Sequence, residues 1–416
     1  MKGFVSKTSL AVVRPAESLL PRCGSCGLFE RGCESPKMKP HGKGRRRVLV
    51  VGEAPGRNED KKGIQFVGKA GEHLWSTVDR LGFSRDDCWT TNAIICWPHE
   101  GERNRTPTPK EIEYCRPTLE RTIREKDPDV ILLLGAVPIS SFLTPRFPSP
   151  MSFGGMGRWT GWKIPCRSPN AWVCPTWHPS YILREKDKPN GGVLQREWER
   201  HLAQAFGTEG KPWESIPNET RKVQSILDPE EAAEAIWETA IRASETGGPI
   251  SWDLETNCLK PDGKDAKIVS CSISNEERTV SFPWHGEAVK AAVEFVKSDI
   301  PKIGANTKFE SRWLKAKHGV WPRNWVWDTM LAAHILDNRP GISGHDFQAF
   351  VRLGMPNYWS HLSPFMRSKG KGGNKENRVG KWEVGIGELL TYNGLDALTE
   401  FKVAEKQAEE MGVKIC

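Results

Sequence analysis

Short apolar runs alternate with amphipathic segments over the first half of the chain. The amphipathic pattern predicts a helix over 70–82 and another from Pro109, where Thr108 is a suitable N-cap and Glu111 completes a capping box. Strands that alternate with helices predict an α/β sheet with much parallel pairing. Three runs are typical of strands buried on both faces, 48–52, 129–135 and 172–176, and a further strand is predicted near 88–95.

The pattern changes after residue 206. Residues 207–224 lack periodicity and are rich in glycine, proline and charge, as linkers are. We therefore predict a first domain over 1–206, a linker over 207–225 and a second domain over 226–416.

The second domain has a different order of elements. Its three predicted strands follow one another closely, in the manner of an antiparallel meander, and a basic loop over 368–381 precedes a long terminal helix. This domain is therefore also α/β, but its antiparallel start predicts another architecture. The predicted elements are a helix over 228–244, strands over 249–255, 267–274 and 278–284, and a helix over 386–411.

Composition excludes several classes of protein. The 416 residues are 38% hydrophobic and 27% charged, which is unlike a collagenous or wholly disordered chain. No apolar stretch is long enough for a membrane helix, and the N-terminus lacks the apolar core of a secretory signal. We expect a cytoplasmic protein with no membrane partner, in the host cytoplasm if the source is a phage.

Charge is unevenly distributed. The net charge is +8, but residues 1–200 hold 33 basic and 22 acidic residues, a balance of +11, while residues 201–416 hold 27 and 30, a balance of −3. A basic first half favours a polyanionic partner, with nucleic acid the first candidate. A mildly acidic second half is compatible with DNA if its acids hold metal ions.

Eleven cysteines in a chain with no export signal favour reduced thiols or metal ligands over a disulfide framework. Cys23 and Cys26 form a C-x-x-C pair, and Cys96 and Cys115 follow far downstream. The four thiols fit a zinc site or an iron–sulfur cluster, although isolated cysteines are often core residues. The remaining thiols are interpreted as structural, among them Cys33, Cys88, Cys166 and Cys174.

Four ordered motifs occur in the first half: residues 52–56 (GEAPG) after a strand, Phe66 in FVGKAG, Asn92 in TTN, and residues 178–180 (HPS). With the four cysteines, they resemble the family 4 uracil-DNA glycosylases, the iron–sulfur type, over about residues 22–205. The resemblance implies a three-layer α/β/α fold, uracil-containing DNA as substrate, and a [4Fe–4S] cluster on the cysteines.

The chemistry of uracil excision explains these residue types. The base must be extruded, so it needs an aromatic face, which Phe66 can supply, and an amide that reads its Watson–Crick edge, for which Asn92 is suited. His178 can stabilise the negative charge that develops on the departing base. Glu53 is the candidate for positioning water, and Ser180 for contacting a backbone phosphate.

Other positions have smaller roles by this resemblance. The backbone at Gly52 and Ala54 contributes to the pocket, and Glu59 supports it. Residues 64–65 (Ile-Gln) depart from the family, which usually has a proline before the phenylalanine. The basic run over 37–47 is either a solvated loop or a phosphate contact.

A second set of acids occurs in the second half. Asp253 and Glu255 are i, i+2 on a predicted strand, so their side chains lie on one face. Tyr392 and Asp396 are i, i+4 on a predicted helix, which also places them on one face. Glu310 follows a short apolar strand between the two pairs.

This order resembles the 3′–5′ exonuclease domain of family A DNA polymerases, of the DnaQ-like group with an RNase H-like fold, over about residues 226–416. It implies two Mg²⁺ or Mn²⁺ ions. Asp253 would bridge both, Glu255 and Asp396 would hold the catalytic one, and Tyr392 would orient water. Glu310 departs from the usual aspartate by one methylene; activity is expected to survive if it reaches the second ion.

The sequence therefore predicts a bifunctional enzyme of DNA repair and replication that acts on uracil-containing DNA and on 3′ ends. Two alternatives stay open. The chain could be a uracil-sensing, DNA-binding subunit with one activity live, or the exonuclease could be a degenerate scaffold around Glu310. We find no polymerase motifs, and expect either a truncated polypeptide or a subunit that works with a separate polymerase, an arrangement that suits a bacteriophage.

Overall fold

The computed structural model describes residues 21–147, 153–275, 277–356, 358 and 385–415. Contacts divide the chain into two compact units, Met1–Ile216 and Pro217–Cys416. They are called the N-terminal unit and the C-terminal unit, and each is described by itself. The predicted basic loop over 368–381 lies outside the described residues.

The N-terminal unit is built on a five-stranded sheet in the order β2-β1-β5-β7-β6. The first four strands pair in parallel, and β6 adds an antiparallel edge. The central strands β1 and β5 are buried along their whole length, as their continuous apolar runs predict. The bounds are β1 Val48–Gly52, β2 Cys88–Asn92, β5 Val130–Leu134, β6 Ile164–Arg167 and β7 Asn170–Thr176.

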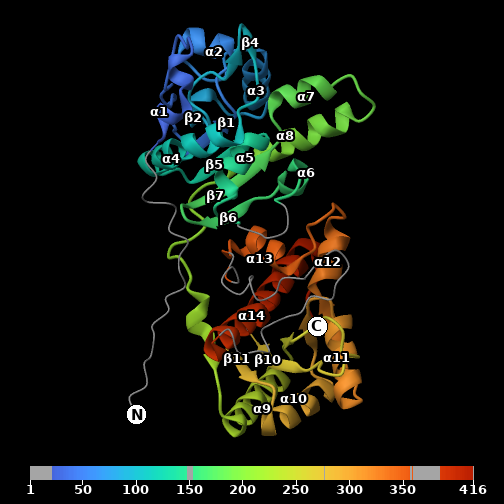
Figure 1. Ribbon diagram of the computed structural model, residues 1–416. Coiled ribbons are helices and arrows are strands. Elements are labelled where there is room, and N and C mark those ends of the chain that lie inside the picture. The colour runs from blue at the N-terminus through green and yellow to red at the C-terminus, as the bar shows by residue number, and fades with distance from the viewer. Residues whose placement is uncertain (1–20, 148–152, 276, 357, 359–384, 416) are drawn as a thin grey trace. The chain divides into compact units, whose positions relative to one another are not determined.

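Helices cover both faces of this sheet (Figure 1). On one face, alternate residues of the strands pack with α3, α7 and α8 in a single core. On the other face α5 contacts β1 and β5, and α4 packs against α5. The expected three-layer α/β/α arrangement is confirmed. The bounds are α1 Cys23–Cys26, α2 Arg57–Lys62, α3 Lys69–Arg80, α4 Pro109–Lys126, α5 Ala136–Leu143, α6 Met156–Trp159, α7 Pro179–Glu185 and α8 Gly191–Gly207.

The segment between β2 and α4 contains a helix cap and a short hairpin. The predicted capping box at the start of α4 is present, because Thr108 and Glu111 satisfy each other's backbone amides. A hairpin of two short strands, β3 His99–Glu100 and β4 Arg103–Asn104, lies between β2 and α4.

The C-terminal unit has a six-stranded sheet in the order β13-β12-β9-β10-β11-β8. Strands β9, β10 and β11 form the predicted antiparallel meander, and the remaining pairs are parallel. A meander extended beyond its first strand by two parallel strands is the expected RNase H-like arrangement. The bounds are β8 Val223–Ser225, β9 Ile250–Thr256, β10 Ile268–Ser274, β11 Thr279–Pro283, β12 Lys302–Gly304 and β13 Trp325–Asp328.

The predicted linker over 207–225 needs one correction. Residues 219–222 form a 3₁₀ helix, and Val223–Ser225 form β8, an edge strand of the C-terminal sheet. Three residues give no periodicity, so the strand has no signal in the sequence. Its partner β11 supplies the pairing that makes it a strand.

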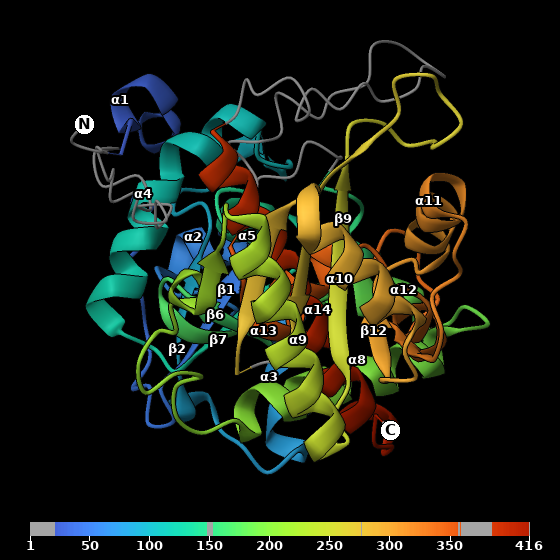
Figure 2. The same ribbon diagram turned by 90° about the horizontal axis from the view of Figure 1, so that it is seen from below.

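The two faces of the C-terminal sheet differ in chemistry. Helices α9, α10 and α11 bury an apolar face that includes Trp252 and Leu254 of β9, and Figure 2 shows α9 and α10 in front of the strands. The other face carries small hydroxyl residues and packs against α14, which α12 and α13 contact in turn. The bounds are α9 Pro229–Thr246, α10 Gly286–Lys297, α11 Lys308–His318, α12 Thr329–Leu336, α13 His345–Leu353 and α14 Ile386–Met411.

Small side chains let the backbone of α14 approach this sheet closely. The Ser251 hydroxyl donates to the carbonyl of Ala397 at 2.6 Å, and the Ser272 hydroxyl donates to the carbonyl of Asn393 at 2.7 Å. A Cβ at Gly394 would lie 2.4 Å from Cγ1 of Val223. These hydrogen bonds fix the short distance between the backbone of α14 and strands β9 and β10.

No helix among the described residues is long and apolar enough to cross a membrane.

The close approach predicts opposite effects for two glycines of α14. Gly394→Ala should lower the free energy of unfolding by about 1–3 kcal/mol, because the added methyl overlaps Val223. Gly387→Ala, where a Cβ would meet nothing within 4 Å, should leave it unchanged or raise it by up to about 1 kcal/mol. Urea unfolding of the two variants measures the difference, and equal stability would contradict the close packing.

Candidate functional sites

A pocket of about 260 Å³ opens at the carboxyl ends of β1 and β2 in the N-terminal unit. These strands are parallel neighbours, and Gly52 lies beside Asn92 at their ends. Side chains that follow the two strands therefore meet at one edge of the sheet. The pocket is lined by Glu53, Ala54, Pro55, Gly56, Glu59, Phe66, Ala70, Gly71, Asn92, Pro98, Asn104, Arg105, His178 and Ser180.

Gly52 makes room for two of the predicted residues. A Cβ there would lie 2.4 Å from Oδ1 of Asn92 and 2.7 Å from Cζ of Phe66. Any side chain at this position would therefore displace the amide or the ring. Asn92 is only 4% exposed, so its polar atoms are available to what enters the pocket and not to bulk water.

Phe66 lies on a tightly held loop. Its φ of 54° is in the left-handed region, and its carbonyl accepts a hydrogen bond from the Trp75 indole at 3.0 Å. A Cβ at Gly71 would lie 2.1 Å from that carbonyl oxygen. Oε1 of Glu59 accepts from the amides of Val67 at 3.0 Å and Gly68 at 2.8 Å, so Glu59 supports the loop from below.

Gln65, which departs from the family pattern, also anchors this loop. Its buried side-chain amide donates to the carbonyl of Lys39 at 2.8 Å and accepts from the Thr90 hydroxyl at 3.2 Å. The Arg85 guanidinium donates to its backbone carbonyl. Side-chain hydrogen bonds therefore fix the loop before Phe66 without a proline ring.

His178 is held in one protonation and tautomeric state. Burial, with a smaller contribution from Arg184, lowers the pKa of its imidazole to about 4. Nδ1 accepts from the backbone N–H of Ser180 at 3.2 Å and lies 2.8 Å from the Ser180 hydroxyl. Since Nδ1 is the acceptor, the neutral ring carries its proton on Nε2 and can donate from there.

Glu53 follows β1 directly and lines the same pocket. Burial raises the pKa of its carboxyl group, and the positive charge of Arg184 opposes that shift. Arg184 also donates a hydrogen bond to the Ser180 hydroxyl at 3.3 Å. One cation therefore acts on Glu53, His178 and Ser180 together.

Two polar residues that line the pocket were not predicted. Asn104 comes from the β3–β4 hairpin, where its Oδ1 accepts from the Trp97 indole at 2.7 Å and so directs its NH₂ group elsewhere. Arg105 pairs with both oxygens of Glu111. The sequence of this segment alone does not single out Asn104 or Arg105, because the β3–β4 hairpin is what brings them to the pocket.

A second hollow of about 440 Å³ adjoins the pocket and shares Glu59, Ala70, Asn104 and Ser180 with it. Its other lining residues include Arg57, Lys69 and Arg184. Basic side chains beside the mouth of the pocket are suited to contact phosphates.

The four predicted cysteines come from three segments of the N-terminal unit. Cys23 and Cys26 lie in α1, Cys115 in α4, which α1 contacts, and Cys96 in the loop after β2. Burial raises the pKa of Cys96 to about 11 and that of Cys115 to about 12, and the charges of the other thiols of the set add to both shifts. All four are free of disulfides.

This donor set suits a metal cluster. Thiols that raise one another's pKa lie close enough to interact, yet they would ionise together only with a cation between them. The Lys37 amide donates to the Cys96 sulfur at 3.3 Å, as backbone amides do around sulfur ligands. Cys33 packs in the same apolar cluster, and its thiol donates to the Leu28 carbonyl.

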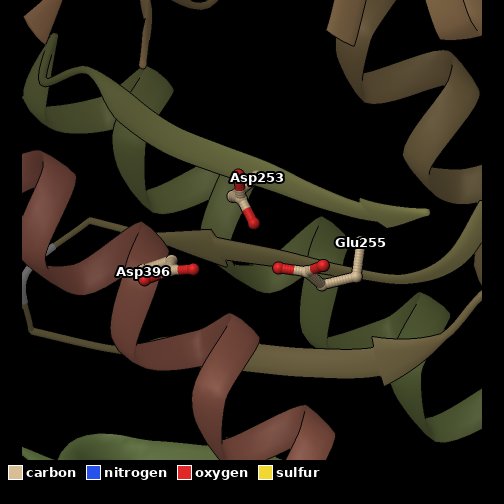
Figure 3. A group of neighbouring side chains, drawn as sticks. All are labelled: Asp253, Glu255 and Asp396. Carbon is tan, nitrogen blue, oxygen red and sulfur yellow. The ribbon is translucent and has the colours of Figure 1, made fainter. Parts of the chain in front are cut away.

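Three acids of the C-terminal unit form a compact group (Figure 3). Carboxylate oxygens of Asp253, Glu255 and Asp396 all lie within 4.8 Å of one another. The first two project from one face of β9, and Asp396 from the facing helix α14. Only oxygen donors are present, which is the set that Mg²⁺ and Mn²⁺ prefer.

The charges of this group are poorly compensated. Burial raises the pKa of Asp253 to about 7, although the Asn393 amide donates to its Oδ2 at 2.7 Å. Burial and then Asp253 raise the pKa of Asp396 well above its ordinary value, and the same is true of Glu255. A divalent cation would supply the missing positive charge.

Tyr392 and Glu310 join the group less closely. The pKa of Tyr392 is raised by burial and by Asp396 and Glu255, which places it in their field. Glu310 lies in the first turn of α11, outside the 4.8 Å group, with its pKa raised by burial and by Asp253.

Three further residues contact this acid group or its neighbours, and no sequence motif predicts them. The Tyr358 hydroxyl donates to Oδ1 of Asp396. Nε2 of His345 lies 2.8 Å from the Thr399 hydroxyl and 3.9 Å from Oδ1 of Asp396. Asn393 was inside the predicted helix, but only the packing of α14 directs its amide toward Asp253.

Comparison with known proteins identifies a family for each unit. The Uracil DNA glycosylase superfamily matches residues 40–203, and a 3′–5′ exonuclease family matches residues 223–353. A type-4 uracil-DNA glycosylase of Thermotoga maritima is 39% identical over 155 residues, which cover 37% of this chain and 75% of that protein. One from Pyrobaculum aerophilum is 32% identical over 195 residues, or 45% of this chain and 90% of that protein.

Another relative aligns with residues of both units. A DNA polymerase of Bacillus phage SP01 is 24% identical over 390 residues, which cover 89% of this chain and 41% of that protein. The order of the two domains is thus found in a longer protein. The chain belongs to the type-4 uracil-DNA glycosylases and carries a 3′–5′ exonuclease domain after its glycosylase domain.

Proposed function

We propose that this chain excises uracil from DNA with its first domain and hydrolyses nucleotides from 3′ ends with its second. The observation that carries the proposal is the pocket at the ends of β1 and β2, where an aromatic ring, a buried amide, a carboxylate and a neutral imidazole line one cavity. The acid group on β9 and α14 supports the second activity.

In the first domain, Phe66 stacks on the flipped uracil and Asn92 pairs with its Watson–Crick edge. Gly52 leaves room for the side chains of Asn92 and Phe66 beside the base, and Ala54 also lines the pocket. The base is extruded into a space shaped for one ring.

Bond cleavage leaves negative charge on the uracil. Nε2–H of His178 donates to that charge, and a neutral donor serves because the nearby Arg184 contributes the positive field. Glu53, in its ionised form, orients water against the sugar. Ser180 and the basic residues of the adjoining hollow contact phosphates that flank the lesion.

In the second domain, Asp253, Glu255 and Asp396 would hold one divalent cation, and Asp253 with Glu310 a second. Such cations supply Lewis-acid chemistry at a scissile phosphate. Tyr392 orients the attacking water, and Asn393 fixes Asp253 in its ligating position.

The cysteine set would hold a [4Fe–4S] cluster with a structural role, since hydrolysis of a glycosidic bond moves no electrons. It ties α1 and α4 to the loop after β2, close to the end of the strand that carries Asn92.

A role beside a DNA polymerase is a second proposal, favoured by the match to the phage polymerase across both units. In that setting the chain would detect uracil and correct 3′ ends during synthesis. It includes the variant in which uracil is sensed and not excised, and release of free uracil separates the two.

The metal content tests the cysteine proposal. Anaerobically purified protein should be brown and contain about four irons per chain. Cys96→Ser should lose iron because a ligand is removed, whereas Cys174→Ala, in the apolar core of the sheet, should keep it. One equivalent of zinc with no iron would exclude the cluster.

The pH dependence of uracil release tests Glu53. Because burial raises its pKa above the ordinary value, release should be level near neutral pH and fall as the pH drops through that raised pKa and Glu53 gains a proton. His178 becomes charged only near pH 4 and should not contribute above that. Glu53→Gln should be slow and lose this acid limb, and the exposed Glu72→Gln should retain it. An unchanged limb in Glu53→Gln would remove Glu53 from the mechanism.

A 5′-labelled oligonucleotide that contains uracil tests both activities at once. Uracil release should persist in EDTA, while 3′ shortening should stop. Asp253→Ala should have the same effect with Mg²⁺ present, because no neutral side chain can replace a carboxylate shared by two cations. Wild-type protein that shortens no single-stranded or 3′-mismatched substrate with Mg²⁺ or Mn²⁺ would leave only the scaffold interpretation of the second domain.

A further inference from the structure

Two carboxylates beside the acid group each have one buried oxygen without a hydrogen-bond partner. Glu310 is 3% exposed and Glu400 is 2% exposed, and Oε2 of each is buried without a partner. Among the described residues, no basic side chain forms an ion pair with either. A buried carboxylate with neither donor nor counter-ion costs several kcal/mol.

The neighbouring acids differ in this respect. Asp253 accepts from the Asn393 amide, and Asp396 accepts from the Tyr358 hydroxyl. Asp328, nearby, accepts from four backbone amides that include those of Thr307 and Met330. The fold therefore supplies donors to these three acids, whereas Oε2 of Glu310 and Oε2 of Glu400 have none.

Glu400 faces the same site as Asp396. The two are i, i+4 on α14, so their side chains lie on one side of the helix. That side packs against β9 and β12. The pKa of Glu400 is raised by burial first and then by the charges of Asp253, Glu310 and Asp396, which agrees with a side chain directed into the acid group.

We propose that Glu400 is a further metal ligand of this site and acts with Glu310 on the second divalent cation, directly or through a water molecule. The inference rests on the proposed exonuclease function. Two ligand sets then share Asp253: the compact one with Glu255 and Asp396, and a second one with Glu310 and Glu400. The second set gives both unpartnered oxygens a cation, and hard oxygen donors suit Mg²⁺ or Mn²⁺.

Mn²⁺ titration of the full-length protein, followed by the EPR signal of the free ion, tests this assignment. Wild type should bind two ions in the exonuclease domain, and Asp253→Ala should lose both. Glu400→Gln keeps the shape of the side chain and removes its charge. It should weaken the binding of one Mn²⁺ ion by tenfold or more and leave the affinity for the other ion unchanged. Glu409→Gln is the matched control, because that glutamate is exposed on the same helix and pairs with Lys406.

The melting temperature in EDTA separates a metal ligand from a structural residue. Glu400→Gln should melt no lower than wild type without metal, because the buried Oε2 has no hydrogen-bond partner to lose, and should gain less from Mn²⁺. If Glu400→Gln fails to fold, Glu400→Asp keeps the charge with a shorter reach and should still weaken the same ion. Uracil release by every variant reports that the rest of the chain is intact.

The outcomes are distinguishable. Suppose that wild type binds two Mn²⁺ ions and that Asp253→Ala loses both. If the Glu400 variants then bind both ions with unchanged affinity, this inference alone is overturned. Wild type that binds no Mn²⁺ would overturn the proposed exonuclease and this inference with it.

Discussion

The close contact between α14 and the small-residue face of the C-terminal sheet determines the acid site. Hydroxyl groups of Ser251 and Ser272 donate to helix carbonyls, and Gly394 leaves no gap beside Val223. At that separation, Asp396 cannot avoid the two carboxylates of β9. The repulsion is a consequence of the packing, and the site is stable in its charged form only when cations take up the negative charge. The serines thus do as much for the metal site as the acids themselves.

The N-terminal unit solves the opposite electrostatic problem. Under the proposed function, its pocket accepts a neutral base and then tolerates a negative one. The ring of His178 is kept neutral by burial, and the positive charge comes from Arg184 at the edge. The charge distribution along the chain agrees with the proposed function: the first half is basic, which suits contact with DNA phosphates, and the second half is slightly acidic, which suits contact through metal ions.

Sequence could predict what local geometry fixes. Same-face pairs, such as Asp253 with Glu255, follow from strand periodicity, and the two α/β domains follow from the order of elements. The roles of Gly52 and Asn92 follow from the resemblance of their motifs to the glycosylase family, and the pairing of β1 with β2 places the two residues side by side. Asn104 and Tyr358 could not be predicted, because each reaches its site only through tertiary packing. Strand β8 could not be predicted for a similar reason, because its three residues form a strand only by pairing with β11.

Asn393 and Gly394 also set the chemical lifetime of the nuclease site. In a flexible chain, the backbone nitrogen after an asparagine can attack the side-chain carbonyl, and a following glycine hinders this least. In α14 the Asn393 amide is fixed between the Ser270 hydroxyl and Asp253, and the helix keeps the backbone away from the geometry of ring closure. Each transient opening of the helix would expose the pair to deamidation, which would place another negative charge against Asp253. Whatever holds α14 on the sheet, bound cations included, therefore also slows the ageing of the enzyme.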